Sequence, residues 1–425
     1  MPASRRRAQA LAREVALVGA GMSPFGIYKE KTSRDLFAEA YQEMRASVDK
    51  GFDPEEIDSL YIGNFASEVF EGQNHLAPIL AGSVGLVPRP ATRIENACAS
   101  GGSALRQGVM AIASGMADLV LVAGVESMSR LDTTGVTDAL SAAGDMLYEM
   151  APGLTFPGVF ASLATAYMKR YGMKPEHLMQ VAIQAHANGA LNPHAQFQAS
   201  IRQIMQTRAA KMREKGAIDP AWENELDFLH DEQANPYVAW PLRLFDCTPV
   251  TDGAACVLLA SGERARDFTD DPIYITGSGQ ASDYSLPGHA ELTSLDSTRL
   301  AAQIAYEMAG ISAVDVCLAE VHDCFTIAEI IATEDLGLFE PGTAFRAVED
   351  GVTSLQGRLP VNSSGGLKAK GHPVGASGVG QVVEVFEQMR GRAGARQVSG
   401  DVPLAITQNL GGTGATCVVH VFERK

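Results

Sequence analysis

The stretch DGAACVLLA at residues 252–260 has a counterpart, GTGATCVVHV, at residues 412–421. In each stretch a turn of small residues leads into an apolar strand that ends its half of the chain. Uninterrupted apolar runs of this kind are typical of strands that are covered on both faces. The two stretches lie too far apart for a solenoid, whose repeats span roughly 20–50 residues. We therefore expect two similar α/β halves that pack against each other.

The first half alternates between strand and helix patterns. Helices are predicted at residues 33–50, with Ser33 as the N-cap, and at residues 98–115. Apolar runs predict strands beside these helices, in EVALVGAGM (14–22), IDSLYIGN (57–64), ATRIENA (91–97) and ADLVLVAGVES (117–127). This β-α-β alternation indicates a layered α/β domain.

The second half repeats the alternation. Strands are predicted in DPIYITGSG (271–279), VCLAEVHD (316–323) and the final stretch 404–423, and helices at 297–310, 324–338 and 375–390. Residues 131–245 differ, because they are rich in Met, His and Ala and show no clear strand. We predict a mostly helical loop domain there, with the charged segment 209–235 as a solvated helical excursion. The predicted units are therefore 1–130 with 246–270, then 131–245, then 271–425.

Composition excludes several classes of function. The net charge of −16 over 425 residues argues against nucleic-acid binding. No apolar run reaches the length of a membrane span, and the N-terminus lacks the apolar core of a signal peptide. The basic start MPASRRRAQALAREV is expected to form a solvated helical arm, with an organellar transit peptide as the alternative. The end, VFERK, carries no targeting signal. Six cysteines without scaffold-like spacing favour reduced thiols in the cytoplasm.

Four stretches carry candidate chemistry, and each lies at a turn next to a predicted strand, where α/β sheets bind ligands. They are NACASGG (96–102), EVHDCFT (320–326), NSSGGLKAKGHPVGASG (362–378) and NLGGTG (409–414). Each also has a structural explanation, because buried cysteines are commonly inert and glycine pairs commonly form turns. His322 and Cys324 resemble half of a zinc site, but no second Cys/His pair has suitable spacing, so we predict no metal.

The four stretches together favour one kind of catalyst. Cys98 is predicted in the first turn of a helix, where backbone N–H groups and the helix dipole favour a thiolate. A thiolate is a good acyl acceptor, a histidine can take its proton, and glycine N–H groups can hold an oxyanion. A second thiol, Cys324, can move a proton at carbon. The set indicates carbon–carbon bond chemistry on a thioester.

On these motifs the chain resembles a thiolase from about residue 14 to its end. NACASGG resembles the nucleophile motif and GHPVGASG the histidine motif, and ADLVLVAGVESMS and NPHAQF are also similar. Where many thiolases have a second catalytic cysteine in Cys-x-Gly, this chain reads Asn409-Leu410-Gly411, and where they have Asn-Glu-Ala-Phe it reads His322-Asp323-Cys324-Phe325. This combination resembles the sterol-carrier-protein-2 type and the related archaeal and bacterial acetyl-CoA acetyltransferase-like thiolases. In them the cysteine of the HDCF motif acts as the acid/base.

The resemblance implies a role for each residue. Cys98 would be the acylated nucleophile and His372 its activator. His322 and His372 would form one oxyanion hole, and the N–H groups of Cys98 and Gly411 the other. Phe325 would line the pantetheine tunnel. Because an acidic chain must still bind an anionic nucleotide tail, the basic residues Lys169, Arg170 and Arg243 are further candidates for coenzyme A binding.

The resemblance also implies partners and an activity. We expect coenzyme A as co-substrate without a permanently bound cofactor, a homodimer or dimer of dimers, and, as in some relatives, a small zinc-containing OB-fold partner protein. The expected activity is CoA-dependent cleavage of a 3-oxoacyl-CoA, the reverse Claisen condensation, or both, through an acyl-Cys98 intermediate. The alternatives are a thiolase-like retro-aldolase and a non-catalytic acyl-CoA-binding subunit. Neither needs Cys98, Cys324 and His372 together.

Overall fold

The computed structural model describes residues 9–215 and 220–425. The basic arm that was predicted to be helical begins in residues 1–8, which lie outside the described residues. Residues 9–14 form no helix, so that part of the prediction is wrong. Arg13 is instead held by ion pairs to Asp118, at 2.6 Å, and to Glu263, at 2.8 Å.

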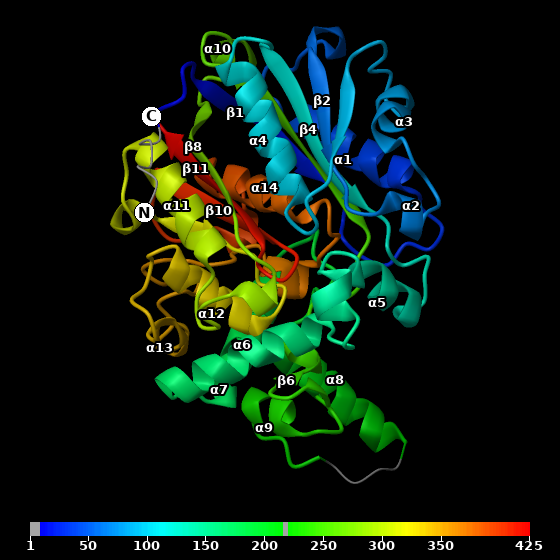
Figure 1. Ribbon diagram of the computed structural model, residues 1–425, viewed down its shortest axis with the longest axis vertical. Coiled ribbons are helices and arrows are strands. Elements are labelled where there is room, and N and C mark those ends of the chain that lie inside the picture. The colour runs from blue at the N-terminus through cyan, green and yellow to red at the C-terminus, as the bar shows by residue number, and fades with distance from the viewer. Residues whose placement is uncertain (1–8, 216–219) are drawn as a thin grey trace.

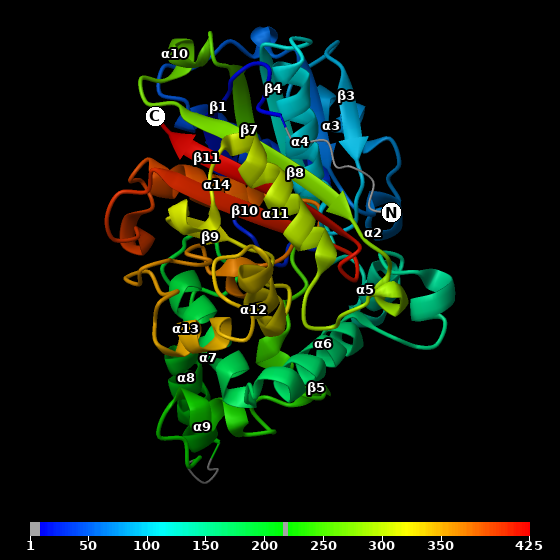
Figure 2. The ribbon, with the colours of Figure 1, turned by 60° about the vertical axis from the view of Figure 1, so that its left-hand side comes forward.

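Nine strands form one mixed sheet in the order β3-β2-β4-β7-β1-β8-β11-β10-β9 (Figures 1 and 2). The strands are β1 (Val15–Met22), β2 (Ser59–Gly63), β3 (Ala91–Ile94), β4 (Leu119–Glu126), β7 (Gly253–Ser261), β8 (Ile273–Ser282), β9 (Leu318–Glu320), β10 (Leu404–Gly411) and β11 (Thr416–Arg424). Outward from the central β1–β8 pair, the first half runs β1-β7-β4-β2 and the second β8-β11-β10-β9. In both halves the first three strands are antiparallel and the fourth is parallel to the third. The stretches DGAACVLLA and GTGATCVVHV form β7 and β11, which occupy the same place, so the predicted repeat is confirmed.

Helices cover the sheet as the sequence predicts, with shifts at their ends. The main ones are α1 (Ser33–Ser47), α4 (Ser100–Ala113), α11 (Asp296–Ala309), α12 (Thr326–Asp335) and α14 (Ser377–Met389). Shorter helices are α2 (Ser67–Phe70), α3 (Leu76–Ser83), α10 (Ala265–Phe268) and α13 (Ala344–Glu349). The predicted N-cap of α1 was one residue off: Thr32 caps the helix by accepting the N–H of Asp35, and Ser33 contacts Glu71.

Alternate residues of the central strands face different cores, which explains why these strands are apolar throughout. On β1, Val15 and Leu17 pack with α4 and α14, whereas Ala16 and Val18 pack with α1. Strands from the second half contribute to the same cluster around α4 and α14, and their other faces pack with α11 and α12. The two halves of the sheet therefore lie on opposite sides of α4 and α14, and the single sheet contributes two of the five layers, α/β/α/β/α.

The region 131–245 lies below the sheet in Figure 1. Its helices are α5 (Thr133–Ser141), α6 (Phe156–Tyr171), α7 (Pro175–Gly189), α8 (Ile201–Glu214) and α9 (Glu225–His230). The sequence showed no strand here, but β5 (Tyr237–Ala239) and β6 (Leu242–Arg243) form a short hairpin, too short to give a periodic pattern. The predicted 209–235 excursion includes the end of α8 and all of α9, and its residues 216–219 lie outside the described residues.

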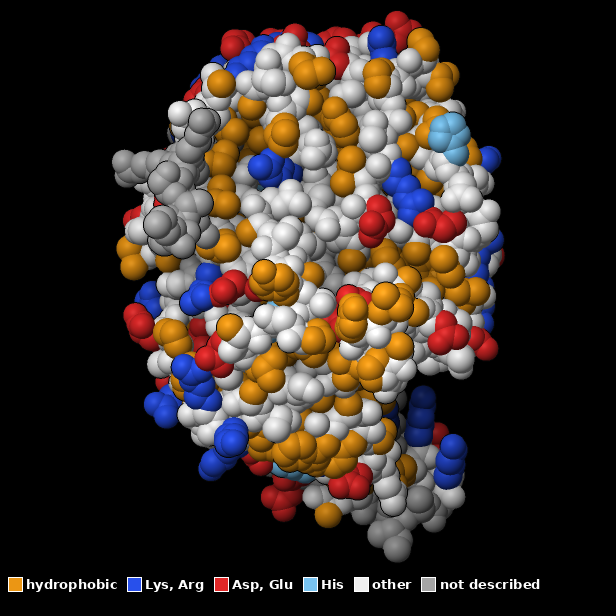
Figure 3. Space-filling model, viewed as in Figure 1, with side chains coloured by type: hydrophobic (Ala, Val, Ile, Leu, Met, Phe, Trp, Pro, Cys, Tyr) orange, Lys and Arg blue, Asp and Glu red, His pale blue; other side chains and the backbone are white. Residues whose placement is uncertain are grey.

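Two surface properties bear on function. Acidic and basic side chains are interspersed over the face in Figure 3. Among the described residues, no helix combines the length and the apolar character that crossing a bilayer requires.

Candidate active site

The first turns of α4 and α14 approach closely because glycines face each other there. A Cβ at Gly378 would lie 2.2 Å from Asn409 Oδ1 and 2.4 Å from the backbone nitrogen of Gly102. No side chain fits at those distances, so glycine permits the contact. It brings the loop that carries Cys98, before α4, next to the loop that carries His372, before α14.

Five residues that the sequence singled out line one cavity of about 100 Å³: Cys98, His322, Cys324, Phe325 and His372. The Phe325 ring stacks on Phe160, with centroids 4.6 Å apart. The cavity wall is mostly apolar and is completed by Met128, Leu140, Phe156, Phe160, Thr248, Pro249, Val250, Val374 and Gly412. The four motifs therefore meet at one site, as predicted.

The surroundings of Cys98 oppose the thiolate that the sequence predicted. It precedes α4, which begins at Ser100, and follows Ala97, whose φ of 49° places it in the left-handed region. Burial raises the pKa of the Cys98 thiol to about 12, although a hydrogen bond from the Gly412 backbone opposes the rise. The N–H groups at the helix end stabilise a Cys98 thiolate. The apolar wall of the cavity destabilises the thiolate by more.

A glycine next to the predicted Gly411 contacts the Cys98 sulfur. Gly412, rather than Gly411, lines the cavity and donates its backbone N–H to the Cys98 thiol. Gly411 is the last residue of β10 and lies against the backbone: a Cβ there would come within 2.7 Å of the Asn96 carbonyl oxygen. Gly411 does not line the cavity, and its role in an oxyanion hole stays a prediction.

His372 is a neutral base whose free nitrogen faces the cavity. Its Nδ1 lies 2.6 Å from Ser377 Oγ, and the Ser377 hydroxyl donates to the Pro373 carbonyl at 2.9 Å. Because the Ser377 hydroxyl hydrogen is used in the bond to Pro373, the Ser377 oxygen accepts a hydrogen bond from Nδ1–H of His372. The Nε2 atom of this neutral ring is then unprotonated. Burial lowers the pKa of His372 to about 3, so the ring is neutral.

His322 has the opposite tautomer, and Asn409 sets it. The Asn409 Oδ1 accepts the N–H of Gly102 at 3.0 Å, and its Nδ2 donates to the Cys98 carbonyl at 3.0 Å. The second N–H of Nδ2 faces His322 Nδ1 at 3.2 Å, so Nδ1 is the acceptor and the proton is on Nε2. Burial, and secondly His372, lower the pKa of His322 well below its usual value. In the sequence, Asn409 stood out only because it replaces a thiol. Its side-chain amide, which can donate and accept hydrogen bonds, is the signal for this role that was overlooked.

The Cys98 sulfur and one ring nitrogen each of His322 and His372 all lie within 4.8 Å of one another. A proton moved from the thiol to His372 Nε2 would leave an Nε2–H on both histidines. The same three atoms form a donor set that a thiophilic metal ion can use. Cys324 completes the site as a second buried, protonated thiol, because burial raises its pKa well above the usual value.

The basic residues predicted to bind coenzyme A lie elsewhere. Lys169 and Arg170 are exposed, and Arg170 pairs with Glu291. Arg243 is buried and bonded to the Asn235 carbonyl and the Tyr237 hydroxyl. None of the three lines the catalytic cavity.

A second cavity of about 620 Å³ adjoins the first and shares Thr248 and Pro249 with it. Arg208 and Lys368 supply its positive charge, and the remaining wall consists of His186, Gln196, Phe197, Gln198, Ala199, Ile204, Leu244, Phe245 and Cys247. The sequence analysis did not predict Arg208, which lies in the interior of α8.

Comparisons with known proteins agree with this geometry. The thiolase N-terminal domain matches residues 15–263, and the thiolase C-terminal domain-like family matches residues 279–424. The chain is 42% identical over 97% of its length to the whole of an acetyl-CoA acetyltransferase from Methanothermobacter thermautotrophicus. It is 30% identical over 96% of its length to 71% of sterol carrier protein 2 from Gallus gallus. The chain belongs to the thiolase family.

Solved structures show the same fold. A structure described as an Ltp2-ChsH2(DUF35) aldolase superposes with a TM-score of 0.77 at 24% identity, over 97% of this chain and 98% of the other. Human mitochondrial 3-ketoacyl-CoA thiolase in complex with CoA gives a TM-score of 0.68 at 21% identity, over 98% of this chain and all of the other. The predicted thiolase fold is confirmed.

Proposed function

We propose that this thiolase is an acetyl-CoA acetyltransferase or 3-oxoacyl-CoA thiolase that works through an acyl-Cys98 intermediate. The observation that carries the proposal is that the Cys98 sulfur and a ring nitrogen of His372 lie within 4.8 Å of each other and that both residues line one cavity. Neither group ionises alone in an apolar wall, but the charges compensate when the proton passes from one to the other.

In the cleavage direction, the Cys98 sulfur attacks the 3-keto carbon of the substrate while its proton moves to His372 Nε2. The Cα–Cβ bond then breaks, and its electrons form the enolate of acetyl-CoA. Nε2–H groups on His322 and His372 can hold the enolate oxygen. The protonated Cys324 thiol is in the form needed to donate a proton to the enolate carbon, which gives acetyl-CoA.

Acyl transfer completes the cycle. The Cys324 thiolate takes the thiol proton of incoming coenzyme A, and the resulting thiolate attacks the acyl-Cys98 carbonyl. The N–H groups of Gly412 and Cys98 stabilise the tetrahedral oxyanion. The Cys98–acyl bond then breaks, and Cys98 recovers its proton from His372. Condensation is the same sequence in reverse.

A retro-aldolase and a non-catalytic acyl-CoA-binding subunit make a different prediction. Neither forms a covalent intermediate, so the test is the intact mass of the protein after mixing with acetyl-CoA. The thiolase should gain one acetyl group, and peptide mapping should place it on Cys98. An unchanged mass under conditions where acetyl-CoA is consumed would contradict the proposal.

We further propose that the second cavity, rather than the neighbourhood of Lys169, Arg170 and Arg243, holds the nucleotide tail of coenzyme A. The cavity is large, adjoins the catalytic one and contains Arg208 and Lys368. A guanidinium matches phosphate geometry well. No permanently bound cofactor is needed for the steps above.

The proposed assembly is a homodimer or dimer of dimers that acts in the cytoplasm, in lipid metabolism or β-oxidation. Strand β3 is a sheet edge with one unpaired side, which supports pairing with another chain. The Ltp2-ChsH2(DUF35) assembly also supports a small partner protein for this chain. Mass photometry of the protein alone tests the dimer, and co-purification tests the partner.

A further inference from the structure

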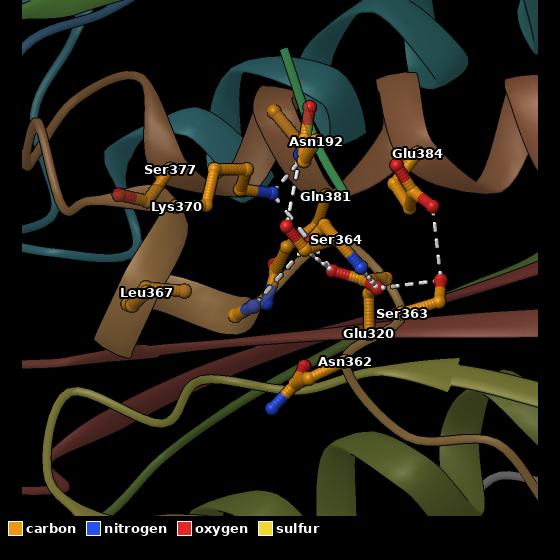
Figure 4. A network of polar contacts seen from close by, with 12 residues as sticks. Asn192, Glu320, Asn362, Ser363, Ser364, Leu367, Lys370, Ser377, Gln381 and Glu384 are labelled. Carbon is orange, nitrogen blue, oxygen red and sulfur yellow. Dashed lines mark hydrogen bonds and ion pairs between the residues drawn. The ribbon is translucent and has the colours of Figure 1, made fainter. Parts of the chain in front are cut away.

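Glu320 and Lys370 form a buried ion pair, which Figure 4 shows with its polar neighbours. Glu320 is fully buried at the end of β9, and Lys370 is 1% exposed; Nζ of Lys370 lies 3.8 Å from Oε2 of Glu320. Glu320 precedes His322 by two residues, and Lys370 precedes His372 by two residues. The pair therefore connects the two chain segments that carry the histidines.

Each partner has further contacts that fix its place. Glu320 Oε1 accepts the N–H of Ser364 at 3.0 Å, and Oε2 accepts the Ser364 hydroxyl at 2.6 Å. Lys370 Nζ donates to the Gly380 carbonyl at 3.3 Å, within α14. Ser377, at the start of the same helix, is the residue that orients His372. Lys370 thus joins β9, which leads to His322, to the helix that orients His372.

Stability does not account for this arrangement. Burying two charges costs several kcal/mol per ion, and well-packed apolar residues are often at least as stable. Burial raises the pKa of Glu320 to about 7 even though Lys370 opposes the rise. A second buried carboxylate nearby, Glu384, has its own partner in Arg396 at 2.8 Å.

We propose that Glu320 and Lys370 are positioning residues that set the separation and orientation of His322 and His372 for holding the enolate. The two rings cross at 86° with centroids 5.0 Å apart. A single residue separates each charge from its histidine, so a shift of the pair moves the rings. Misplacing such donors by about 1 Å can cost roughly 10²-fold in rate. The inference rests on the proposed function, because it assumes that the two histidines hold an enolate.

The test compares two matched variants, Glu320→Gln and Glu384→Gln. Both remove a buried carboxylate, and the Ser363 hydroxyl lies within hydrogen-bond distance of both, at 3.2 Å and 3.0 Å. The readouts are the melting temperature, the rate of Cys98 acetylation by acetyl-CoA, and the exchange of α-protons of acetyl-CoA with deuterated water. Acetylation needs His372 as its base, whereas α-proton exchange needs both histidines as donors.

Glu320→Gln should slow α-proton exchange by about 10–10²-fold, and by more than it slows acetylation. Glu384→Gln should lower the melting temperature by about as much as Glu320→Gln does. Its rate of α-proton exchange should stay within about threefold of the parent rate. Lys370→Met should resemble Glu320→Gln, and the double variant should be no slower than the worse single one, because both changes break the same pair.

The proposal is overturned if folded Glu320→Gln or Lys370→Met exchanges α-protons at the parent rate, or if Glu384→Gln slows exchange equally. Should Lys370→Met fail to fold, Glu320→Gln decides alone, since it keeps the side-chain volume and an amide oxygen that can accept the Ser364 N–H. Failure of the proposed function looks different: the unsubstituted protein would then form no acetyl-Cys98.

Discussion

The two halves of the sheet have the same strand order but very different chemistry. In the first half, the loop before α4 carries the proposed nucleophile Cys98; in the second, the loop before α14 carries the proposed base His372. Asn64 follows β2 and holds the carboxylate of Glu126, whereas His322 follows the equivalent strand β9 and faces the cavity. The duplication places loops at equivalent positions, and divergence of the loops supplies a thiol from one half and acid–base groups from the other.

The largest expected effect comes from removing a thiol from each half. Cys98→Ala should abolish acetylation and turnover. Cys324→Ala should still be acetylated but lose about 10²–10⁴-fold in α-proton exchange and cleavage, the usual cost of a lost general acid. Cys317→Ala, a thiol outside the cavity, is the control and should behave like the parent. If Cys324→Ala keeps normal exchange, the acid–base role passes to another group.

A smaller effect is expected at Asn409, where the halves are joined by hydrogen bonds. Asn409→Ala removes the donor to His322 Nδ1 and frees its tautomer. Loss of an orienting partner typically costs about 10–10²-fold. We expect a loss of this size in the rate of α-proton exchange and a smaller change in the rate of acetylation. Quenched-flow mixing followed by mass spectrometry measures both rates. Equal losses in both steps would show that Asn409 serves the Cys98 loop through its bond to the Cys98 carbonyl instead.

The contact between α4 and α14 can be broken directly. Gly378→Ala places a Cβ against Asn409 Oδ1 and the Gly102 nitrogen, so we expect a loss of about 1–3 kcal/mol in the free energy of unfolding and a slower reaction. The matched control is Gly82→Ala in α3, where a Cβ meets nothing within 4 Å and should be neutral or slightly stabilising. Denaturant titration measures both. A neutral Gly378→Ala would mean that the two helices can separate without loss.

The pH dependence tests whether the nucleophile and base rest as neutral groups. A base whose pKa is lowered stays unprotonated as the pH falls, so His372, at about 3, should remain competent far below pH 6.5. Acetylation at about pH 5.5 should be within about twofold of that at pH 7.5, whereas an ordinary histidine with a pKa near 6.5 would lose about tenfold. An acid limb centred near pH 6.5 in single-turnover acetylation would contradict the neutral pair.

The smallest expected effect concerns the nucleotide tail. Arg208→Gln should raise the KM for coenzyme A by about threefold or more with little change in kcat, because the contact is made equally before and during reaction. Arg170→Gln should change neither constant, since exposed ion pairs contribute little. If Arg170→Gln raised the KM for coenzyme A more than Arg208→Gln did, the nucleotide tail would bind near Arg170, as the sequence suggested.

The sequence predicted the fold and the convergence of motifs because both depend on local patterns. Apolar runs and small-residue turns such as GTGATCVVHV identify strands, and the strand ends of one sheet lie close together. The charge state of Cys98 could not be predicted in this way. It depends on Phe156 and Met128, which come from distant parts of the chain and form an apolar wall.

Hydrogen-bond partners were equally hidden. Asn409 meets Gly102 and His322 only after α4 and α14 have packed, and the exchange of Gly411 for Gly412 depends on how β10 turns into β11. Arg208 was not singled out from the sequence, because its cavity is formed together with Thr248 and Pro249, which lie far along the chain.

The raised pKa of Cys98 has a consequence for how fast this thiol is oxidised. Peroxide and alkylating reagents attack thiolates, not thiols. With its pKa raised to about 12, Cys98 should be oxidised more slowly in the resting protein than an ordinary exposed thiol. Its reactivity arises only when a thioester is present to receive the sulfur as the proton leaves. Durability between turnovers and nucleophilicity during turnover therefore come from the same apolar wall.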